Sequence, residues 1–63
     1  MITFHLTNGT KIDSSSYDEF STKDIWDAIR QIVFDAGYFH IETDNSMVSV
    51  NPEHIIAIER HKD

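Results

Sequence analysis

Four histidines and eleven acidic residues are the side chains of this sequence that could bind a metal ion. His40 and Glu42 stand two residues apart, so they would share one face of a strand, and His5 has the parity to join them from a neighbouring strand. Zinc requires three or four convergent nitrogen, oxygen or sulfur ligands. The four histidines show neither His-x-His nor His-x-x-x-His spacing. We therefore interpret them as solvated histidines on an open sheet face and predict no metal and no cofactor.

Catalysis is not indicated either, and we predict that the protein is not an enzyme. Acid–base catalysis requires a carboxyl group or a histidine in a cleft that shifts its pKa, and 63 residues leave little room for a cleft. The run from Ser14 to Ser16 has no nucleophile-elbow setting, and neither glycine lies in a phosphate-binding motif. The absence of cysteine excludes thiol chemistry and fits a reducing compartment. With no signal-peptide pattern at Met1, a cytoplasmic location is expected.

The pattern of elements predicts a single α+β domain over residues 1–63, in the order ββαβββ, with one helix on one face of an antiparallel sheet of four to five strands. Ile2, Phe4 and Leu6 alternate with polar residues, as in a half-buried strand. A three-residue loop over 7–9 keeps Phe4 opposite Ile12 on the inner face, and it requires Gly9 to be left-handed. A two-residue loop would place Ile12 on the polar face.

The helix is expected over Thr22 to Ala36. Ser21 can cap it and Asp24 stands three residues later, a near match to a capping box. Gly37 is expected to end the helix as its left-handed residue.

The second half of the chain predicts a hairpin and a last strand. The hairpin turns at Asp44 and Asn45, two residues that tolerate positive φ. Such a turn pairs Ile41 with Val48 and Phe39 with Val50 on one face. In the last strand, Ile55 to Arg60, the residues Ile56 and Ile58 are expected on one face and Ile55 and Ala57 on the other.

Phe34 lies opposite the apolar stripe of the predicted helix, about 180° from Ile25. Its neighbours on this outer face are Asp27, Arg30 and Gln31. Two explanations are open. The loop from Ser14 to Phe20, with Tyr17 in it, folds over Phe34, or a partner protein covers it.

The net charge of −6 argues against direct binding to nucleic acid or to anionic membranes and permits binding to a basic protein surface. Acidic residues gather before and on the helix, at Asp18, Glu19, Asp24 and Asp27. Some of them suit the positive end of the helix dipole. As a group they also form a negative strip that could engage a groove lined by Lys and Arg.

The outer sheet face is expected to carry an apolar patch that could form a homodimer interface. Its members are Tyr38, Met47, Ile55 and Ala57.

In size, acidity and lack of cysteine, the chain is similar to small phage-encoded proteins that disable host enzymes, including anti-CRISPR proteins. Our leading hypothesis, to which this resemblance adds no residue, is a non-catalytic interaction protein, most concretely a small acidic inhibitor that occupies a basic, nucleic-acid-binding surface on a larger protein. The anchors would be Phe34 and Tyr17, with the acidic strip guiding approach. The alternative is a homo-oligomeric structural or accessory module.

Overall fold

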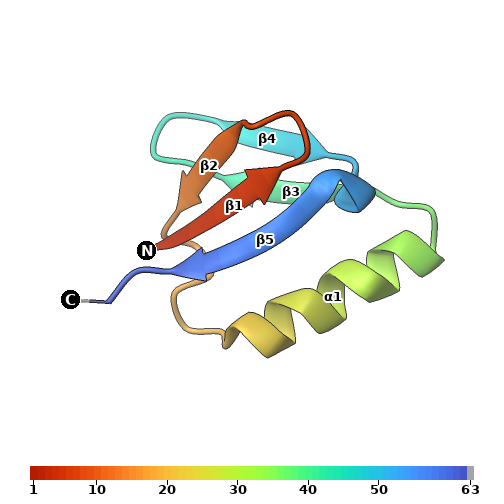
Figure 1. Cartoon of the computed structure of the whole chain (residues 1–63), viewed down its shortest axis with the longest axis horizontal. Coiled ribbons are helices and arrows are strands. Elements are labelled where there is room, and N and C mark those ends of the chain that lie inside the picture. The colour runs from red at the N-terminus through yellow and green to blue at the C-terminus, as the bar shows by residue number, and fades with distance from the viewer. Residues whose placement is uncertain (63) are drawn as a thin grey trace.

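The computed structural model describes residues 1–62 and has the expected order ββαβββ, with a short 3₁₀ turn added before the last strand (Figure 1). Two antiparallel hairpins and the helix surround a common centre, and the last strand pairs with the first. The elements are β1 (Ile2–Leu6), β2 (Lys11–Ser14), α1 (Thr22–Phe34), β3 (Phe39–Glu42), β4 (Met47–Val50), the 3₁₀ turn η1 (Pro52–His54) and β5 (Ile55–Arg60).

The first hairpin has the predicted register. Phe4 lies opposite Ile12, and the Leu6 N–H donates to the Thr10 carbonyl at 2.9 Å, which leaves residues 7–9 as the loop. Gly9 has φ +85°, a conformation that an L side chain rarely adopts. The prediction of a three-residue loop is confirmed.

The second hairpin has the predicted register through a different turn. Ile41 lies opposite Val48 and Phe39 opposite Val50. However, positive φ occurs within residues 1–62 only at Gly9 and Ala36, so the turn at residues 44–45 does not use it. The Thr43 N–H donates to the Ser46 carbonyl at 2.8 Å, and the Thr43 hydroxyl donates to the same oxygen at 3.1 Å. The threonine side chain therefore helps to close this turn.

The prediction of one continuous sheet is wrong, because the strands form a three-stranded sheet, β2-β1-β5, and a separate pair, β3-β4. Ile41 and Phe39 direct their backbone groups towards β4, so the carbonyls of His40 and Glu42 point the other way. Side-chain hydroxyls occupy these outward carbonyls. Ser14 donates to the Glu42 carbonyl at 2.6 Å and Tyr17 to the His40 carbonyl at 2.7 Å. Two side-chain hydrogen bonds, one from the end of β2 and one from the loop after it, therefore stand where backbone hydrogen bonds between β2 and β3 could have formed.

Helix α1 begins as predicted and ends differently. The Ser21 hydroxyl accepts from the Asp24 N–H at 3.0 Å. The last helical residue is Phe34, and Ala36, rather than Gly37, is the left-handed residue, with φ +56°. The Gly37 N–H donates to the Ile32 carbonyl at 2.9 Å, which gives the Schellman ending in which the left-handed position precedes the last donor. The expectation for Gly37 is therefore wrong by one residue.

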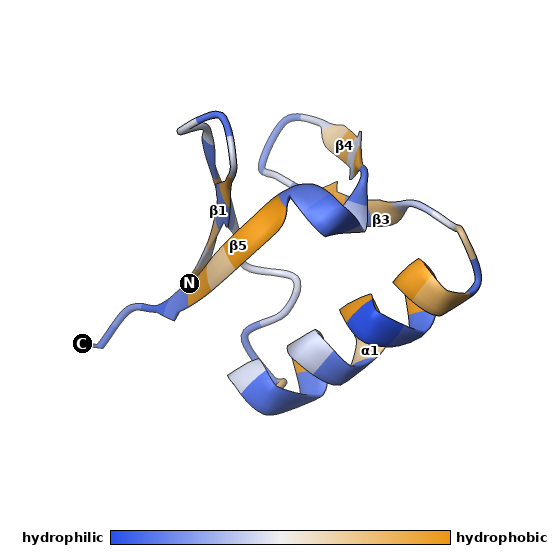
Figure 2. Cartoon of the chain, turned by 45° about the vertical axis from the view of Figure 1, so that its right-hand side comes forward, coloured by the Kyte–Doolittle hydropathy of each residue, from blue (hydrophilic) through white to orange (hydrophobic). Residues whose placement is uncertain are grey.

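The core lies between the three-stranded sheet, the β3-β4 hairpin and the helix (Figure 2). It combines alternating residues of β1 and β3 with the inward stripe of α1, and the edges of Tyr17, Trp26 and other half-buried side chains pack around it. The buried hydrophobic residues are Ile2, Phe4, Ile25, Ile29, Phe39, Ile41, Val50 and Ile55.

Ile55 belongs to this core, which corrects its predicted place on the outer face. Leu6 lies opposite Ile55 and His5 opposite Ala57, so Ile56 is an extra residue with no partner on β1. Such a bulge reverses the side-chain alternation on either side of it. Ile55 is consequently 6% exposed, whereas Ile56 is 61% exposed.

Candidate protein-binding site

The loop between β2 and α1 is fastened to the domain at several points. The Met1 amino group pairs with the Asp18 carboxylate at 3.0 Å. The Arg60 guanidinium donates to the Asp18 carbonyl at 3.1 Å and also to the Phe20 carbonyl. Together with the Tyr17 hydroxyl bond to β3, these contacts hold the loop in one place.

Tyr17 is half-buried and serves as a packing residue of the domain. Its ring meets Phe4 edge-on at a centroid distance of 5.6 Å and stacks on Phe39 at 5.4 Å. Burial raises the pKa of the Tyr17 phenol, and the nearby Glu42 carboxylate raises it further. Its expected role as a partner anchor stays a prediction, and its position leaves only part of the ring for a partner.

The fastened loop and the start of α1 enclose an apolar hollow of about 320 Å³, which we call the aromatic hollow. Its wall contains three aromatic rings and a single charged group, Asp24. Phe20, which is 50% exposed, lies on the loop beside Tyr17 with their ring centroids 6.3 Å apart. The lining residues are Tyr17, Phe20, Asp24, Ile25, Ala28 and Phe39. The sequence predictions did not include Phe20 among the binding residues, although a second aromatic residue three positions after Tyr17 was a signal for it.

The acidic strip is less continuous than the sequence suggested. Asp18 is paired with the N-terminus. Asp27 is paired with Lys23 at 3.0 Å and with Arg30 at 3.2 Å. Within residues 1–62, the carboxylates of Glu19 and Asp24 form no salt bridge. Of these two residues, Asp24 belongs to the lining of the aromatic hollow, and Glu19 directly precedes Phe20, which also lines it.

Phe34 is 84% exposed, the largest exposed fraction among the large hydrophobic residues of the described part. The Tyr17 loop does not cover it, because Tyr17 packs against Phe4 and Phe39 instead. Its polar neighbours bond among themselves, since Asp27 pairs with Arg30 and Gln31 donates to the Asp35 carboxylate at 3.2 Å. Of the two explanations for Phe34, cover by the loop is excluded and cover by a partner stays a prediction.

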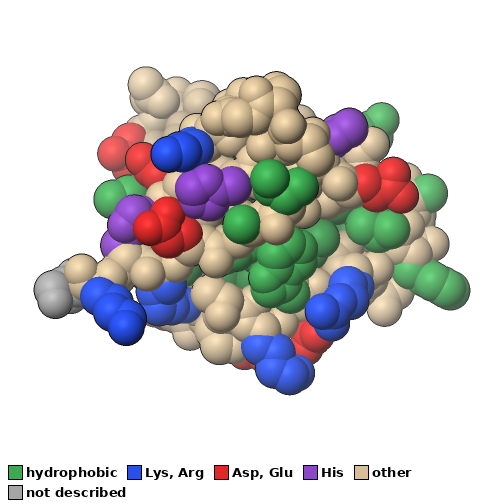
Figure 3. Space-filling model, viewed as in Figure 1, with side chains coloured by type: hydrophobic (Ala, Val, Ile, Leu, Met, Phe, Trp, Pro, Cys, Tyr) green, Lys and Arg blue, Asp and Glu red, His purple; other side chains and the backbone are tan. Residues whose placement is uncertain are grey.

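A second apolar surface lies between α1 and β5, on the other side of the helix from the aromatic hollow, and we call it the α1–β5 groove. Figure 3 shows hydrophobic side chains gathered between β5 and α1, with Lys and Arg side chains along the lower part of this face. The groove has a volume of about 410 Å³. Trp26, Ile29, Arg30, Val33, Pro52, Glu53 and Ile55 line it. It thus carries charges of both signs at its margin, unlike the aromatic hollow.

The four residues predicted to form an outer apolar patch for a homodimer do not lie together on one face. Tyr38 and Met47, 66% and 58% exposed, lie next to or on the β3-β4 hairpin, whereas Ala57 lies on β5 in the other sheet. Ile55 is in the core. The division of the sheet and the bulge in β5 therefore separate residues that strand parity alone would group.

The histidine side chains form hydrogen bonds with other polar groups of the chain. His5 bonds Glu59 across the β1–β5 pair at 3.0 Å, and His40 bonds Ser49 at 2.7 Å, so His5 and His40 lie in different sheets. The His61 ring and the Asp13 carboxylate both bond the buried Thr3 hydroxyl at 2.6 Å. In residues 1–62, no group of three or more His, Asp or Glu side chains is arranged to hold a metal ion.

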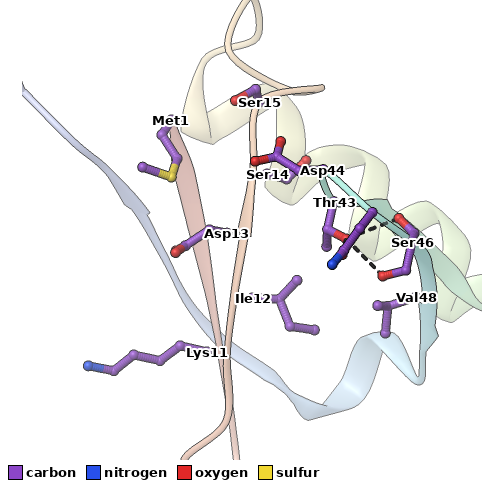
Figure 4. Close-up of a pocket in the computed structure, with 11 residues that line it drawn as sticks. Met1, Lys11, Ile12, Asp13, Ser14, Ser15, Thr43, Asp44, Ser46 and Val48 are labelled. Carbon is purple, nitrogen blue, oxygen red and sulfur yellow. Dashed lines mark hydrogen bonds between the residues drawn. The ribbon is translucent and has the colours of Figure 1, made fainter.

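A further hollow lies where the two sheets are separated. It measures about 490 Å³ and lies between β2 and the turn of the β3-β4 hairpin (Figure 4). Ile12 and Val48 lie within it, and serines and acidic residues of both hairpins surround them. The Thr43 and Ser46 side chains on its wall bond each other rather than facing a common point. This arrangement gives the hollow no convergent set of catalytic groups.

No helix in the described part of the chain has both the length and the apolar composition needed to cross a membrane. Comparison with known proteins finds no match to any protein-family model, any curated protein or any solved structure.

Proposed function

We propose that this chain is a non-catalytic interaction protein that binds a basic surface of a larger protein. The observation that carries this proposal is the aromatic hollow, an apolar depression whose lining includes Asp24, a carboxylate that forms no salt bridge within residues 1–62. Apolar anchoring sites surrounded by charge of one sign are typical of interfaces that combine affinity with electrostatic steering. The net charge of −6 supports a partner of opposite charge.

The concrete form that we propose is an inhibitor, of the kind that phages encode, which covers a nucleic-acid-binding surface of a host enzyme. Such surfaces are basic because they contact phosphates. An acidic protein with a fixed apolar anchoring site competes for the same surface. Phe34 supplies a further anchor if the partner extends to the outer face of α1.

The experiment is affinity capture with the full chain, followed by a salt titration of the isolated partner. A basic partner is expected, with affinity that falls steeply between about 50 and 200 mM salt and with competition from nucleic acid. Glu19→Gln combined with Asp24→Asn should weaken capture at low salt. The matched control is Asp44→Asn combined with Glu53→Gln, which removes equal charge at residues outside the lining of the hollow and should weaken capture less. Equal weakening by both pairs would contradict a site at the hollow.

Self-association is the alternative, and the free edge of β5 favours it. The His61 N–H donates to the Met1 carbonyl, so alternate residues of β5 direct their backbone groups towards β1 and the residues between them point outwards. Ile58 is one of these outward residues, and β5 is an end strand of the sheet, an edge that can pair with a second copy. The side chain of Ile56, at the bulge of the same strand, is 61% exposed. Sedimentation equilibrium separates the two functions. A dimer that persists in high salt and is lost in Ile56→Lys would replace a basic partner as the conclusion.

A further inference from the structure

We infer that the aromatic hollow is a receptor for one arginine side chain of the partner. This inference rests on the proposed function, because it specifies how a basic partner would be recognised. The hollow measures about 320 Å³, at the lower end of the range for ligand pockets, which suits a single side chain.

The wall of the aromatic hollow matches the parts of an arginine side chain. A guanidinium is attracted to the faces of aromatic rings, and the half-exposed ring of Phe20 supplies one, with the part of the Tyr17 ring that Phe39 leaves uncovered beside it at a centroid distance of 6.3 Å. The methylene stem of arginine can lie on apolar wall atoms, which Ile25 and Ala28 provide. Asp24 is the only charged residue of the lining, so it is the acceptor for the guanidinium.

The Asp24 carboxylate is available because the capping box is only half formed. Ser21 accepts a hydrogen bond from the Asp24 N–H, but in residues 1–62 the Asp24 side chain makes no hydrogen bond in return. Its full negative charge exceeds the partial positive charge of the helix start. An apolar occupant would remove water from this carboxylate without replacing the lost hydrogen bonds, which is unfavourable.

The site is also formed before any ligand arrives. The amino group of Met1, the guanidinium of Arg60 and the hydroxyl of Tyr17 each fix the loop that carries the aromatic rings. A fixed site loses little conformational entropy on binding. Arginine is favoured over lysine because a planar guanidinium both stacks on a ring and donates two parallel hydrogen bonds to a carboxylate, whereas an ammonium is a compact point charge.

The test uses three small probes of equal alkyl length with the full chain, followed by NMR: n-butylguanidinium, n-butylammonium and n-butylurea. We expect n-butylguanidinium to shift the Ala28 methyl and Phe20 ring resonances saturably. Its affinity should exceed that of either other probe by about tenfold, the ratio that corresponds to about 1.4 kcal/mol. Asp24→Asn and Phe20→Ala should each reduce n-butylguanidinium binding by about the same factor. Glu53→Gln, which removes the carboxylate beside the α1–β5 groove, is the matched control and should leave the affinity unchanged.

Each contrary outcome overturns a stated part of the inference. Equal binding of n-butylurea would show a site for neutral groups, and equal binding of n-butylammonium would remove the preference for arginine. If no probe binds while a basic partner is still captured in a salt-dependent manner, the inference fails and the proposed function stands. If n-butylguanidinium binds at the hollow but no basic partner is captured, the proposed function fails and the cation site remains. Circular dichroism of Phe20→Ala confirms that the variant is folded before its affinity is compared.

Discussion

The two ends of helix α1 are constructed in opposite ways. At the N-terminal end, Ser21 caps the helix and Asp24 places negative charge at the positive pole of the dipole. At the C-terminal end, the cap residue is Asp35, the last turn has no basic residue, and Ala36 is held at φ +56°. The first end satisfies the usual rules for helix termini. The second keeps the usual Schellman geometry but departs from them in its charge and in having alanine, rather than glycine, at the left-handed position.

The surroundings differ in the same direction. The N-terminal end is joined to the rest of the domain by the fastened loop and borders the aromatic hollow. The C-terminal end carries Phe34 and is followed by Tyr38, 84% and 66% exposed. Local stability follows buried contacts and capping. The start of α1 is therefore fixed by contacts with its loop, whereas the end of the helix leaves large aromatic side chains exposed.

The largest effect is expected on the free energy of unfolding, when a core residue near the start of the helix and an exposed residue at its end are each truncated to alanine. Ile25→Ala removes a side chain that is 3% exposed and should lower the free energy of unfolding by about 2 to 5 kcal/mol through a cavity. Phe34→Ala should change it by no more than about 0.5 kcal/mol. Urea unfolding of both variants measures the difference. If Phe34→Ala proved as damaging as Ile25→Ala, the end of the helix would be packed in solution and the comparison would fail.

The cap at the start of the helix supplies the next effect. Ser21→Ala removes the acceptor of the Asp24 N–H and should lower the free energy of unfolding by about 1 kcal/mol. Ser21→Asp keeps an acceptor at the cap and serves as the control, with stability close to that of the original chain. Thermal unfolding followed by circular dichroism is sufficient. No loss in Ser21→Ala would mean that capping does not distinguish the two ends.

Tyr17 connects the start of the helix to β3, and its phenol should make stability depend on alkaline pH. In the unfolded chain the phenol ionises near pH 10, whereas burial and Glu42 raise its pKa in the fold. The stability contributed by the neutral phenol is therefore complete below about pH 10 and is lost as the pH rises through the folded-state pKa.

Tyr17→Phe removes both the bond to the His40 carbonyl and this pH dependence. It should lower the free energy of unfolding at pH 7 by about 0.5 to 1.5 kcal/mol and flatten its decline above pH 10. The control is Tyr38→Phe, which removes an exposed phenol. Equal flattening in the two variants, measured by urea unfolding across the alkaline range, would contradict a special role for Tyr17.

The smallest expected effect is a gain at the other end of the helix. Ala36→Gly keeps the left-handed conformation but removes the strain that a side chain causes in it. The change should raise the free energy of unfolding by about 0.5 to 1 kcal/mol, even though glycine is more flexible in the unfolded chain. Ala28→Gly, at an interior helical position, should do the reverse by a similar amount. A loss of stability in Ala36→Gly would show that the strained ending is stabilised by contacts beyond its backbone.

Local sequence patterns determined much of the fold. The spacing of Phe4, Gly9 and Ile12 was sufficient for the register of the first hairpin, because strand parity and a left-handed turn position restrict the pairing to one solution. Ser21 before an apolar stripe predicted the start of α1 for a similar reason, since a cap and a periodicity are both local. The composition also indicated an acidic chain whose partner would be basic, which remains a prediction.

The tertiary structure alone decided how these elements combine. The sheet is divided, and Ser14 and Tyr17 bond the carbonyls of β3 with their side chains where a backbone ladder could have formed. No spacing along the chain indicates these contacts, which join residues 28 and 23 positions apart. Ile55 is buried because a bulge at Ile56 reverses the alternation, and a bulge depends on the neighbouring strand. The aromatic hollow arises in the same way, since Tyr17 and Phe20 become a wall only when Arg60 and the N-terminus hold their loop against the domain. Periodicity in the sequence indicates which face of a helix or strand is apolar, but only the packing of the whole domain determines which other elements that face contacts.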